Sequence, residues 1–193
     1  MIAEAPLMET DELRAQLEQL HASSFGWALA CCRRDHSDAE EVLQIAYLKV
    51  LEGKARFNGS ASFKTWLFAV IRKTALDQRR KHFLRSVFIL RAEEHRSAGS
   101  RVERPDESAY RSEMQAVFRS ALGRLPNRQR EALQLVFYHD LSLQEAAVVM
   151  GVSIGSARTH YDRGKKRLRE LLEESEELYE SEWERKANSA TVR

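Results

Sequence analysis

The chain of 193 residues contains only three prolines and eight glycines, and this scarcity limits the folds that are open to it. Folds of many short strands need frequent turns, and Gly and Pro supply most turn conformations. Long helices need few turns and therefore few Gly and Pro residues. Because 43% of the residues are hydrophobic, the chain can bury a core, which excludes disorder throughout. We therefore expect an all-α protein of one ordinary domain or two small ones.

The net charge of +2 conceals blocks of opposite sign. Residues 54–104 hold 13 basic and four acidic residues, whereas residues 9–41 hold eight acidic and three basic ones, and residues 170–184 hold eight Glu and no base. Any nucleic-acid surface should thus be local and lie in the central block. The polar stretch from Glu93 to Glu107 contains Gly, Ser and Pro, so we expect a flexible linker between two helical domains there.

Several classes of protein are disfavoured. The longest apolar run, residues 66–71, is far shorter than the roughly 20 residues of a membrane span. The N-terminus lacks the basic start of a signal peptide, so we expect a cytoplasmic protein without membrane contact. The adjacent Cys31 and Cys32 form neither a disulfide framework nor a zinc motif. Six scattered histidines, without HExxH or a glycine-rich phosphate loop, indicate no enzyme, no catalytic residue, no metal and no cofactor.

One predicted helix has an unusual outer side. Ser37 to Glu40 has the Ser-x-x-Glu form of a capping box, which predicts a helix from there to about Leu51. Helical spacing buries one side: Ala39, Val42, Leu43, Ala46 and Val50. The opposite side mixes acidic, polar and aliphatic residues: Asp38, Glu41, Gln44, Ile45 and Leu48. A solvated face would usually lack the two aliphatic residues, so we favour a protein-docking surface over a solvated one.

A second predicted helix, residues 62–81, follows the Asn58-Gly59-Ser60 turn and has a cationic side. Its buried side comprises Phe63, Trp66, Leu67, Val70, Ile71 and Thr74, and its cationic side comprises Arg72, Lys73, Arg79 and Arg80. A solvated charged face would mix signs, yet Asp77 is the only acid in this helix, so we favour phosphate binding. Phe57, Phe63, Trp66 and Phe68 are able to stack on unpaired bases, although core packing is favoured for Phe63 and Trp66.

The C-terminal part reads as a helix-turn-helix. Pro126 begins one helix, Ser142 to Glu145 forms a capping box for a short second one that stops at Gly151, and Ser153 caps a third from Ile154 to about Leu172. The inner stripe of the third helix is Ile154, Ala157, Tyr161, Gly164, Leu168 and Leu171. Its outer side carries Ser156, Thr159, Arg163 and Lys166, flanked by Arg158 and His160. Short polar residues near the start of such a helix reach base edges, and cations further along reach phosphates.

Two stretches of the chain resemble one family. Residues 38–81, DAEEVLQIAYLKVLEGKARFNGSASFKTWLFAVIRKTALDQRRK, resemble region 2 of the extracytoplasmic-function (ECF) sigma factors of the sigma-70 family. Residues 121–171, ALGRLPNRQREALQLVFYHDLSLQEAAVVMGVSIGSARTHYDRGKKRLREL, resemble region 4 of the same family. The order and spacing of the two motifs match the family, and with the flanking helices the resemblance covers about residues 13–172.

The resemblance implies a division into region 2 at residues 1–92, a linker at 93–109, region 4 at 110–172 and an acidic extension at 173–193. It implies a transcription initiation factor that binds core RNA polymerase, at the β′ clamp coiled coil and the β flap, and promoter DNA, with an anti-sigma factor as a further candidate partner. The core-binding residues would be Asp38, Glu40, Glu41, Gln44, Ile45 and Leu48. The residues that contact and open the −10 element would be Phe57, Asn58, Ser60, Lys64, Trp66, Arg72, Lys73, Asp77, Arg79 and Arg80. The residues at the −35 element would be Ser153, Ser156, Arg158, Thr159, His160, Arg163 and Lys166.

Two alternatives stay open at this point. An autonomous helix-turn-helix regulator would have the same DNA-reading half, but it leaves the face with Glu41, Ile45 and Leu48 unexplained, and nothing in the sequence suggests a dimer seam. The acidic extension from residue 173 is either inert or folds back on the basic DNA-binding faces.

Overall fold

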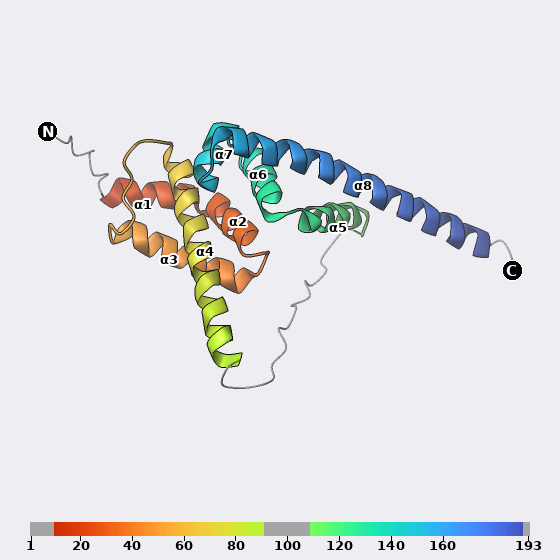
Figure 1. The fold of residues 1–193 in the computed structure, drawn as a ribbon, viewed down its shortest axis with the longest axis horizontal. Coiled ribbons are helices and arrows are strands. Elements are labelled where there is room, and N and C mark those ends of the chain that lie inside the picture. The colour runs from red at the N-terminus through yellow and green to blue at the C-terminus, as the bar shows by residue number, and fades with distance from the viewer. Residues whose placement is uncertain (1–9, 91–108, 191–193) are drawn as a thin grey trace.

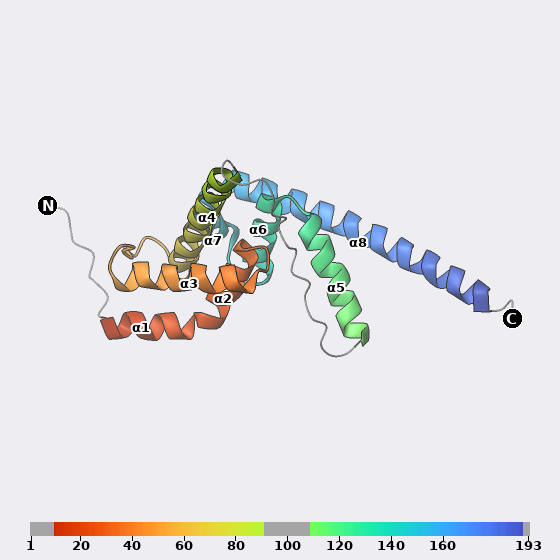
Figure 2. The same ribbon diagram turned by 90° about the horizontal axis from the view of Figure 1, so that it is seen from below.

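The computed structural model describes residues 10–90 and 109–190, and these residues form eight helices in two groups (Figures 1 and 2). The N-terminal group comprises α1 (Thr10–Gln19), α2 (His21–Cys31), α3 (His36–Leu51) and α4 (Phe63–Leu90). The C-terminal group comprises α5 (Ala109–Arg124), α6 (Asn127–Phe137), α7 (Leu143–Met150) and α8 (Ile154–Ala190). The all-α prediction is confirmed, because the described residues contain no strand. Within the same residues, none of the helices combines the length and apolar character needed to cross a bilayer.

The start of α3 differs from the prediction. Asp35, with extended backbone, is the N-cap, and its Oδ1 accepts a hydrogen bond from the Asp38 amide at 2.9 Å. Ser37 therefore lies inside the first turn, and the capping box predicted at Ser37 is wrong. The chain reverses just before this cap through Arg33 and Arg34, which both have positive φ, so the helix begins as soon as the reversal ends.

Both long helices run past their predicted ends. Helix α4 continues to Leu90 instead of stopping near residue 81, and α8 continues to Ala190 instead of stopping near residue 172. No Gly or Pro occurs in these continuations to end a helix. In Figures 1 and 2 the second half of α8 extends away from the other helices and does not fold back on them. The linker expected at residues 93–109 lies outside the described residues, apart from Ala109, where α5 begins.

The turn between α7 and α8 follows the prediction closely. Ser142 and Glu145 form the capping box of α7, in which each side chain accepts from the other residue's backbone amide. Gly151 ends α7 with φ of +64°, a left-handed conformation that costs glycine little. Ser153 then caps α8, because its Oγ accepts from the Ser156 amide at 3.2 Å. The helix-turn-helix prediction is confirmed in its capping details.

The two groups of helices share one core. Trp27, Leu67 and Phe68 from the N-terminal group are buried in the same apolar cluster as Leu135 and Met150 from the C-terminal group. Helix α4 packs against α7, and α2 contacts α6. A second cluster lies within the C-terminal group: Ala121, Leu122, Leu125, Leu133 and Leu171. The sequence predicts two helical units but does not predict that they pack together.

Candidate functional site

The outer face of α3 is exposed as predicted, and we call its residues Asp38, Glu41, Gln44, Ile45 and Leu48 the α3 outer face. The opposite residues of the helix, from Ala39 to Val50, are buried against α2 and α4. Leu48 is 54% exposed, and Ile45 is half-buried. Glu41 accepts a hydrogen bond from Gln78 of α4, which holds its carboxylate on this face. Exposed Leu51, which the sequence reasoning missed, extends the apolar surface one turn further, and its i, i+3 spacing from Leu48 was the available signal.

The loop before α4 is held in place by its own polar side chains and by aromatic packing. The Oδ1 of Asn58 accepts from the Ser60 amide at 3.1 Å and from the Ser60 hydroxyl at 2.7 Å. Phe57 packs on Phe63 and Trp66, with ring centroids 5.4 Å away in each case. Asn58 and Ser60 are therefore presented to solvent on a loop whose base is fixed to the start of α4.

The predicted cationic side of α4 is only partly exposed. Lys73, Arg79 and Arg80 are exposed, and Asp77 is half-buried among them. Arg72 is a correction: it is only 8% exposed, and its guanidinium lies against the carboxylate of Glu131 in α6, with Nη2 to Oε2 at 3.2 Å. Helical periodicity predicted that Arg72 is exposed with the other basic residues, because the pattern within one helix does not show that α6 covers this edge of α4.

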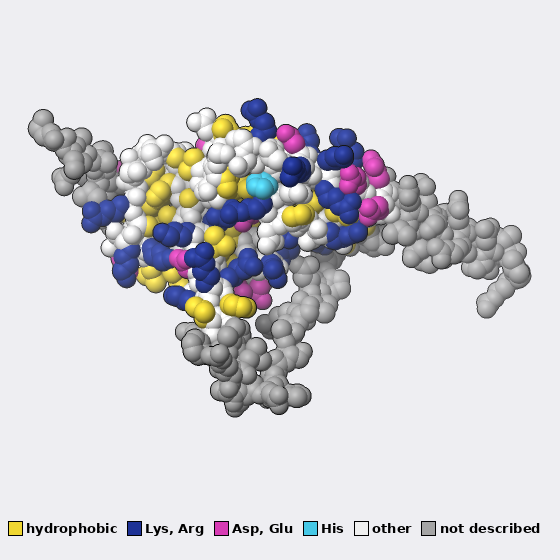
Figure 3. Space-filling view, in the orientation of Figure 1, with side chains coloured by type: hydrophobic (Ala, Val, Ile, Leu, Met, Phe, Trp, Pro, Cys, Tyr) yellow, Lys and Arg dark blue, Asp and Glu magenta, His cyan; other side chains and the backbone are white. Residues whose placement is uncertain are grey.

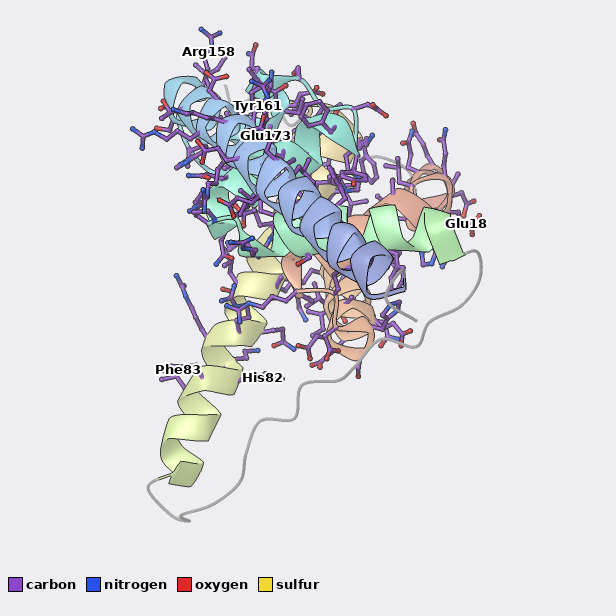
Figure 4. All side chains as sticks on the ribbon, turned by 90° about the vertical axis from the view of Figure 1, so that its right-hand side faces the viewer. Glu18, His82, Phe83, Arg158, Tyr161 and Glu173 are labelled. Carbon is purple, nitrogen blue, oxygen red and sulfur yellow. The ribbon has the colours of Figure 1, made fainter. Side chains whose placement is uncertain are left out.

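The start of α8 presents its polar residues outward. Ser153, Ser156, Arg158, Thr159, Arg163 and Lys166 are exposed, and His160 is half-buried. Figure 4 shows Arg158 projecting away from the helices near this end of α8. Ala157, Gly164 and Leu171 are buried as predicted. Ile154 is a second correction, because it is 49% exposed: it is the first residue of α8, and the buried stripe starts at Ala157.

The exposed bases lie on two elements that are far apart in sequence. Figure 3 shows Lys and Arg side chains gathered over α4 and over the first half of α8 on one face of the molecule. Acidic side chains appear beside them further along α8, where Arg167 pairs with Glu170 at 2.9 Å. A face on which positive charge gathers in this way suits a polyanion such as nucleic acid.

His139 is a buried residue whose position the sequence does not predict. Its ring lies edge-on to Trp27 and Phe68, with centroids 5.7 and 4.9 Å away. Burial, with the nearby positive charge of Lys64, lowers the pKa of His139 to about 4. The ring is therefore neutral at pH 7 and packs as an aromatic group. No cluster of three or more metal-ligating side chains occurs in the described part of the chain.

The comparisons with known proteins agree on one family. Residues 18–83 match the family model described as Sigma-70 region 2, and residues 115–168 match Sigma-70, region 4. The chain is 32% identical over 165 residues to the ECF RNA polymerase sigma factor SigX of Bacillus subtilis (strain 168), which covers 83% of this chain and 85% of SigX. It is 30% identical over 156 residues to the RNA polymerase sigma factor CarQ of Myxococcus xanthus, covering 81% and 87%.

Solved structures share the fold. The sigma factor RpoE in complex with the anti-sigma factor NepR from Bartonella quintana superposes with a TM-score of 0.64 at 24% identity, covering 84% of this chain and 98% of that one. CnrH in complex with the cytosolic domain of CnrY superposes with a TM-score of 0.59 at 20% identity, covering 86% and 90%. At these identities the likeness concerns the fold alone.

Proposed function

We propose residue-level roles for this chain, which belongs to the ECF sigma factors of the sigma-70 family and is an alternative sigma factor that directs transcription initiation. The region 2 match covers the end of α1, all of α2 and α3, and most of α4, and the region 4 match covers the second half of α5, all of α6 and α7, and α8 as far as residue 168. The proposal assigns core polymerase to the α3 outer face, the −10 element to the loop before α4 and α4 itself, and the −35 element to the start of α8. In this proposal the chain acts in the cytoplasm, where RNA polymerase works. None of the proposed roles requires a catalytic side chain.

The single observation that carries the docking assignment is Leu48, which is 54% exposed between acidic and polar neighbours. An aliphatic side chain on such a face gains free energy only when a partner covers it, at about 25 cal/mol per Å² of apolar surface. Acidic Asp38 and Glu41 lie on the same face, two to three turns nearer the start of α3, and would attract a basic partner surface. The combination fits a basic, partly apolar docking surface on core polymerase.

Promoter opening is assigned to the loop before α4 and to the exposed bases of α4. Asn58 and Ser60 offer short hydrogen-bonding groups on a fixed loop, which suits an unpaired base. Lys73, Arg79 and Arg80 offer phosphate contacts beside it. The proposed set is completed by Phe57, Lys64, Trp66, Arg72 and Asp77, although Arg72 is covered by α6 in this structure.

Upstream recognition is assigned to the start of α8. Ser156 and Thr159 are exposed near the helix N-terminus, where a recognition helix contacts base edges, and Arg163 and Lys166 follow one and two turns later. The hydroxyl of Thr159 donates to the Gly155 carbonyl at 2.9 Å, so its oxygen is free to accept from a base. The β flap of core polymerase is a further proposed partner of the chain. Because the structurally similar sigma factor RpoE is in complex with the anti-sigma factor NepR, an anti-sigma factor is a further proposed partner.

A charge reversal on the α3 outer face tests the docking assignment. Glu41→Lys replaces attraction by repulsion against a basic surface, a change that reaches several kcal/mol when the contact is desolvated. Pull-down of core polymerase and transcription in vitro should both fall sharply, while the melting temperature stays near that of the wild type because Glu41 is exposed. Glu173→Lys on α8 makes the same charge change on another exposed residue and is the matched control (Figure 4). Wild-type core affinity in Glu41→Lys would refute the assignment.

A further inference from the structure

A cavity of about 360 Å³ lies between the α2–α3 turn and helices α5 and α6, and its wall is strongly basic. Four arginines line it: Arg33 and Arg34 from the turn, Arg119 from α5 and Arg130 from α6. Asn127 and Gln134 add polar groups, and no described Asp or Glu belongs to the lining. We call this cavity the arginine pocket. None of the residues proposed above for polymerase or DNA lines it.

The side chains of the arginine pocket find little compensation for their charge. Among the described residues, Arg33 and Arg119 make neither an ion pair nor a side-chain hydrogen bond. Arg130 donates to neutral acceptors, the Gly123 carbonyl at 3.3 Å and Asn127 Oδ1 at 2.8 Å. The positive charge of the pocket is therefore largely unbalanced within this part of the chain.

Arg130 shows the electrostatic cost of this arrangement. The residue is half-buried, and its burial, followed by the positive charge of Arg33, lowers the pKa of its guanidinium. Glu131 opposes this lowering, but its Oε2 lies against Arg72 and Arg128, at 3.2 and 3.3 Å. Partly buried like charges repel one another, and an opposite charge among them removes the repulsion. The arginine pocket therefore favours an anion.

The turn holds two arginines in a backbone conformation that favours glycine. Arg33 and Arg34 have φ of +54° and +66°, the left-handed region that most L-residues seldom adopt. The Arg34 amide donates to the Leu29 carbonyl at 2.8 Å, a hydrogen bond typical of the Schellman helix end, where glycine is the usual residue. Such strained positions cluster where side chains have a functional role. The turn thus points to a role for these two guanidinium groups.

An apolar cleft of about 770 Å³ adjoins the arginine pocket. The walls of the two cavities share Ala30, Arg34, Arg119, Leu122 and Gln134. The rest of the cleft is lined mainly by apolar and aromatic residues: Gly26, Leu29, Val117, Phe118, Tyr138 and Leu172. Small-molecule sites combine an apolar wall of this extent with a few convergent polar groups. The two cavities together match a ligand with one charged end and one apolar or aromatic end.

We propose that the arginine pocket and the apolar cleft bind a small organic diphosphate, with its phosphates at the arginines and its apolar or aromatic body in the cleft. Guanidinium groups bind phosphate oxygens through paired hydrogen bonds, and several of them balance the charge of two phosphate groups. A DNA duplex fits less well, because its phosphates lie on a convex surface and the pocket is a concavity between three elements. Nucleoside diphosphates and prenyl diphosphates share the proposed chemistry.

Isothermal titration calorimetry of the full-length chain tests the site with inorganic pyrophosphate, ADP and geranyl diphosphate. Pyrophosphate should bind once per chain. At least one organic probe should bind about tenfold more tightly than pyrophosphate, because its body covers apolar surface of the cleft. Tighter binding of ADP would identify a nucleotide site, and tighter binding of geranyl diphosphate would identify a prenyl diphosphate site. Either result supports the proposal.

Arg33→Gly separates ligand binding from folding. Glycine tolerates the left-handed backbone at this position, so the melting temperature should stay near that of the wild type. The affinity for pyrophosphate should fall about tenfold or more, because a charged hydrogen-bond donor is lost. Arg119→Ala removes a guanidinium from α5 and should weaken pyrophosphate binding in the same way. Arg80→Ala is the matched control, because it removes an exposed positive charge outside the pocket.

Gly26→Leu tests the apolar cleft. Gly26 lines the cleft, and a Cβ there would make an ordinary contact with the His139 ring at 3.7 Å, so a side chain can begin at this position without a clash. The added leucine should occupy part of the cleft. It should weaken binding of the organic probes toward that of pyrophosphate and leave the affinity for pyrophosphate unchanged.

Four results would overturn the proposal. The first is that the wild type binds none of the probes, and the second is that no organic probe binds more tightly than pyrophosphate. The third is an equal loss of pyrophosphate affinity in Arg80→Ala and Arg33→Gly, which would mean that only general positive charge matters. The fourth is that Arg33→Gly weakens binding of a fluorescein-labelled DNA strand in fluorescence anisotropy but binds pyrophosphate as the wild type does, which would make the turn a nucleic-acid surface.

The site is independent of the roles proposed for α3, α4 and α8. None of these measurements involves polymerase, so failure of the sigma function itself would be seen separately, as absence of core binding by the wild type.

Discussion

The guanidinium of Arg72 in α4 and the carboxylate of Glu131 in α6 lie 3.2 Å apart, although the two residues are 59 residues apart in sequence. The ion pair says more about how α6 is positioned on α4 than about how much free energy it contributes to folding. Replacing a buried pair by well-packed apolar groups is often neutral, whereas removal of one partner costs about 3–5 kcal/mol because the other charge is left unpaired. The pair therefore specifies how region 4 sits on region 2, while the apolar cluster around Trp27 and Phe68 supplies the main stabilisation.

Mild acid is expected to weaken this packing through His139. Its pKa is about 4 in the folded chain and 6.5 when exposed, so the unfolded chain takes up the proton first. The contribution of His139 is complete above pH 6.5 and is lost as the pH falls toward 4, in total roughly 3 kcal/mol at 1.36 kcal/mol per pKa unit. Lys64 lowers this pKa and Asp140 opposes it, but burial dominates.

Urea unfolding between pH 6.5 and 5 measures this effect above the range in which most carboxylates titrate. His139→Phe keeps an aromatic ring between Trp27 and Phe68 and removes the titration, so its free energy of unfolding should depend less on pH than that of the wild type. If the free energy of unfolding depended on pH equally in the two proteins, His139 would not be the group responsible.

The crossing of α6 and α8 depends on Gly164. A Cβ at this position would lie 3.2 Å from the Gln129 carbonyl oxygen and 3.2 Å from Leu133 side-chain atoms, which is tighter than ordinary packing. Gly164→Val should therefore cost about 1–3 kcal/mol through overpacking. Gly155→Val is the control in the same helix, where the nearest atom to a Cβ is the Ser153 hydroxyl at 4.0 Å. Thermal unfolding of both variants checks the difference, and equal melting temperatures would argue against a close α6–α8 contact.

The faces of α3 and α8 were predictable from sequence, and the way the two regions pack was not. Periodicity within one helix correctly buries Val42 and Ala157 and exposes Leu48 and Thr159, because the burial of each face follows from its own residues. It failed at Arg72, whose burial depends on a partner in α6. His139 gave no signal at all, because its position between two rings is created only when α6 and α7 meet α2 and α4.

Helix ends were predictable only where a strong local signal exists. Ser142, Gly151 and Ser153 marked their ends correctly through capping and a left-handed residue. At α3 the cap is Asp35, not Ser37, because two residues with positive φ place the chain reversal just before it. The residue-level contacts with polymerase and DNA stay predictions.

The exposed Arg79 and Arg80 of α4 should bind promoter DNA through its phosphates. Arg79→Ala/Arg80→Ala should weaken holoenzyme on its promoter and reduce the slope of log K against log salt by about 0.7–0.9 per lost phosphate contact. Core binding should persist, because neither residue belongs to the α3 outer face. Arg14→Ala, on exposed α1, is the control. A salt slope equal to that of the wild type would mean that these bases face only solvent.

The start of α8 should separate base readout from phosphate contact. Thr159→Ala should change the preferred base at one position of the −35 element by about 1–3 kcal/mol, whereas Lys166→Ala should weaken all sequences about equally and lower the salt slope by about 1. Selection from a promoter library with each holoenzyme measures both effects. Identical preferences in wild type and Thr159→Ala would contradict the assignment of this residue to base readout.

Transcription reconstituted from purified components measures whether this chain acts as a sigma factor. Core polymerase is incubated with fragmented genomic DNA, with and without the full chain, and the 5′ ends of the transcripts are mapped, while gel shifts on the same promoters compare the chain alone with the chain plus core. We expect discrete start sites that require the chain, are lost with Glu41→Lys, and lie downstream of DNA that the chain binds mainly in the presence of core. Absence of chain-dependent start sites, together with tight binding of duplex promoter DNA by the chain alone, would speak against a sigma factor and favour an autonomous regulator.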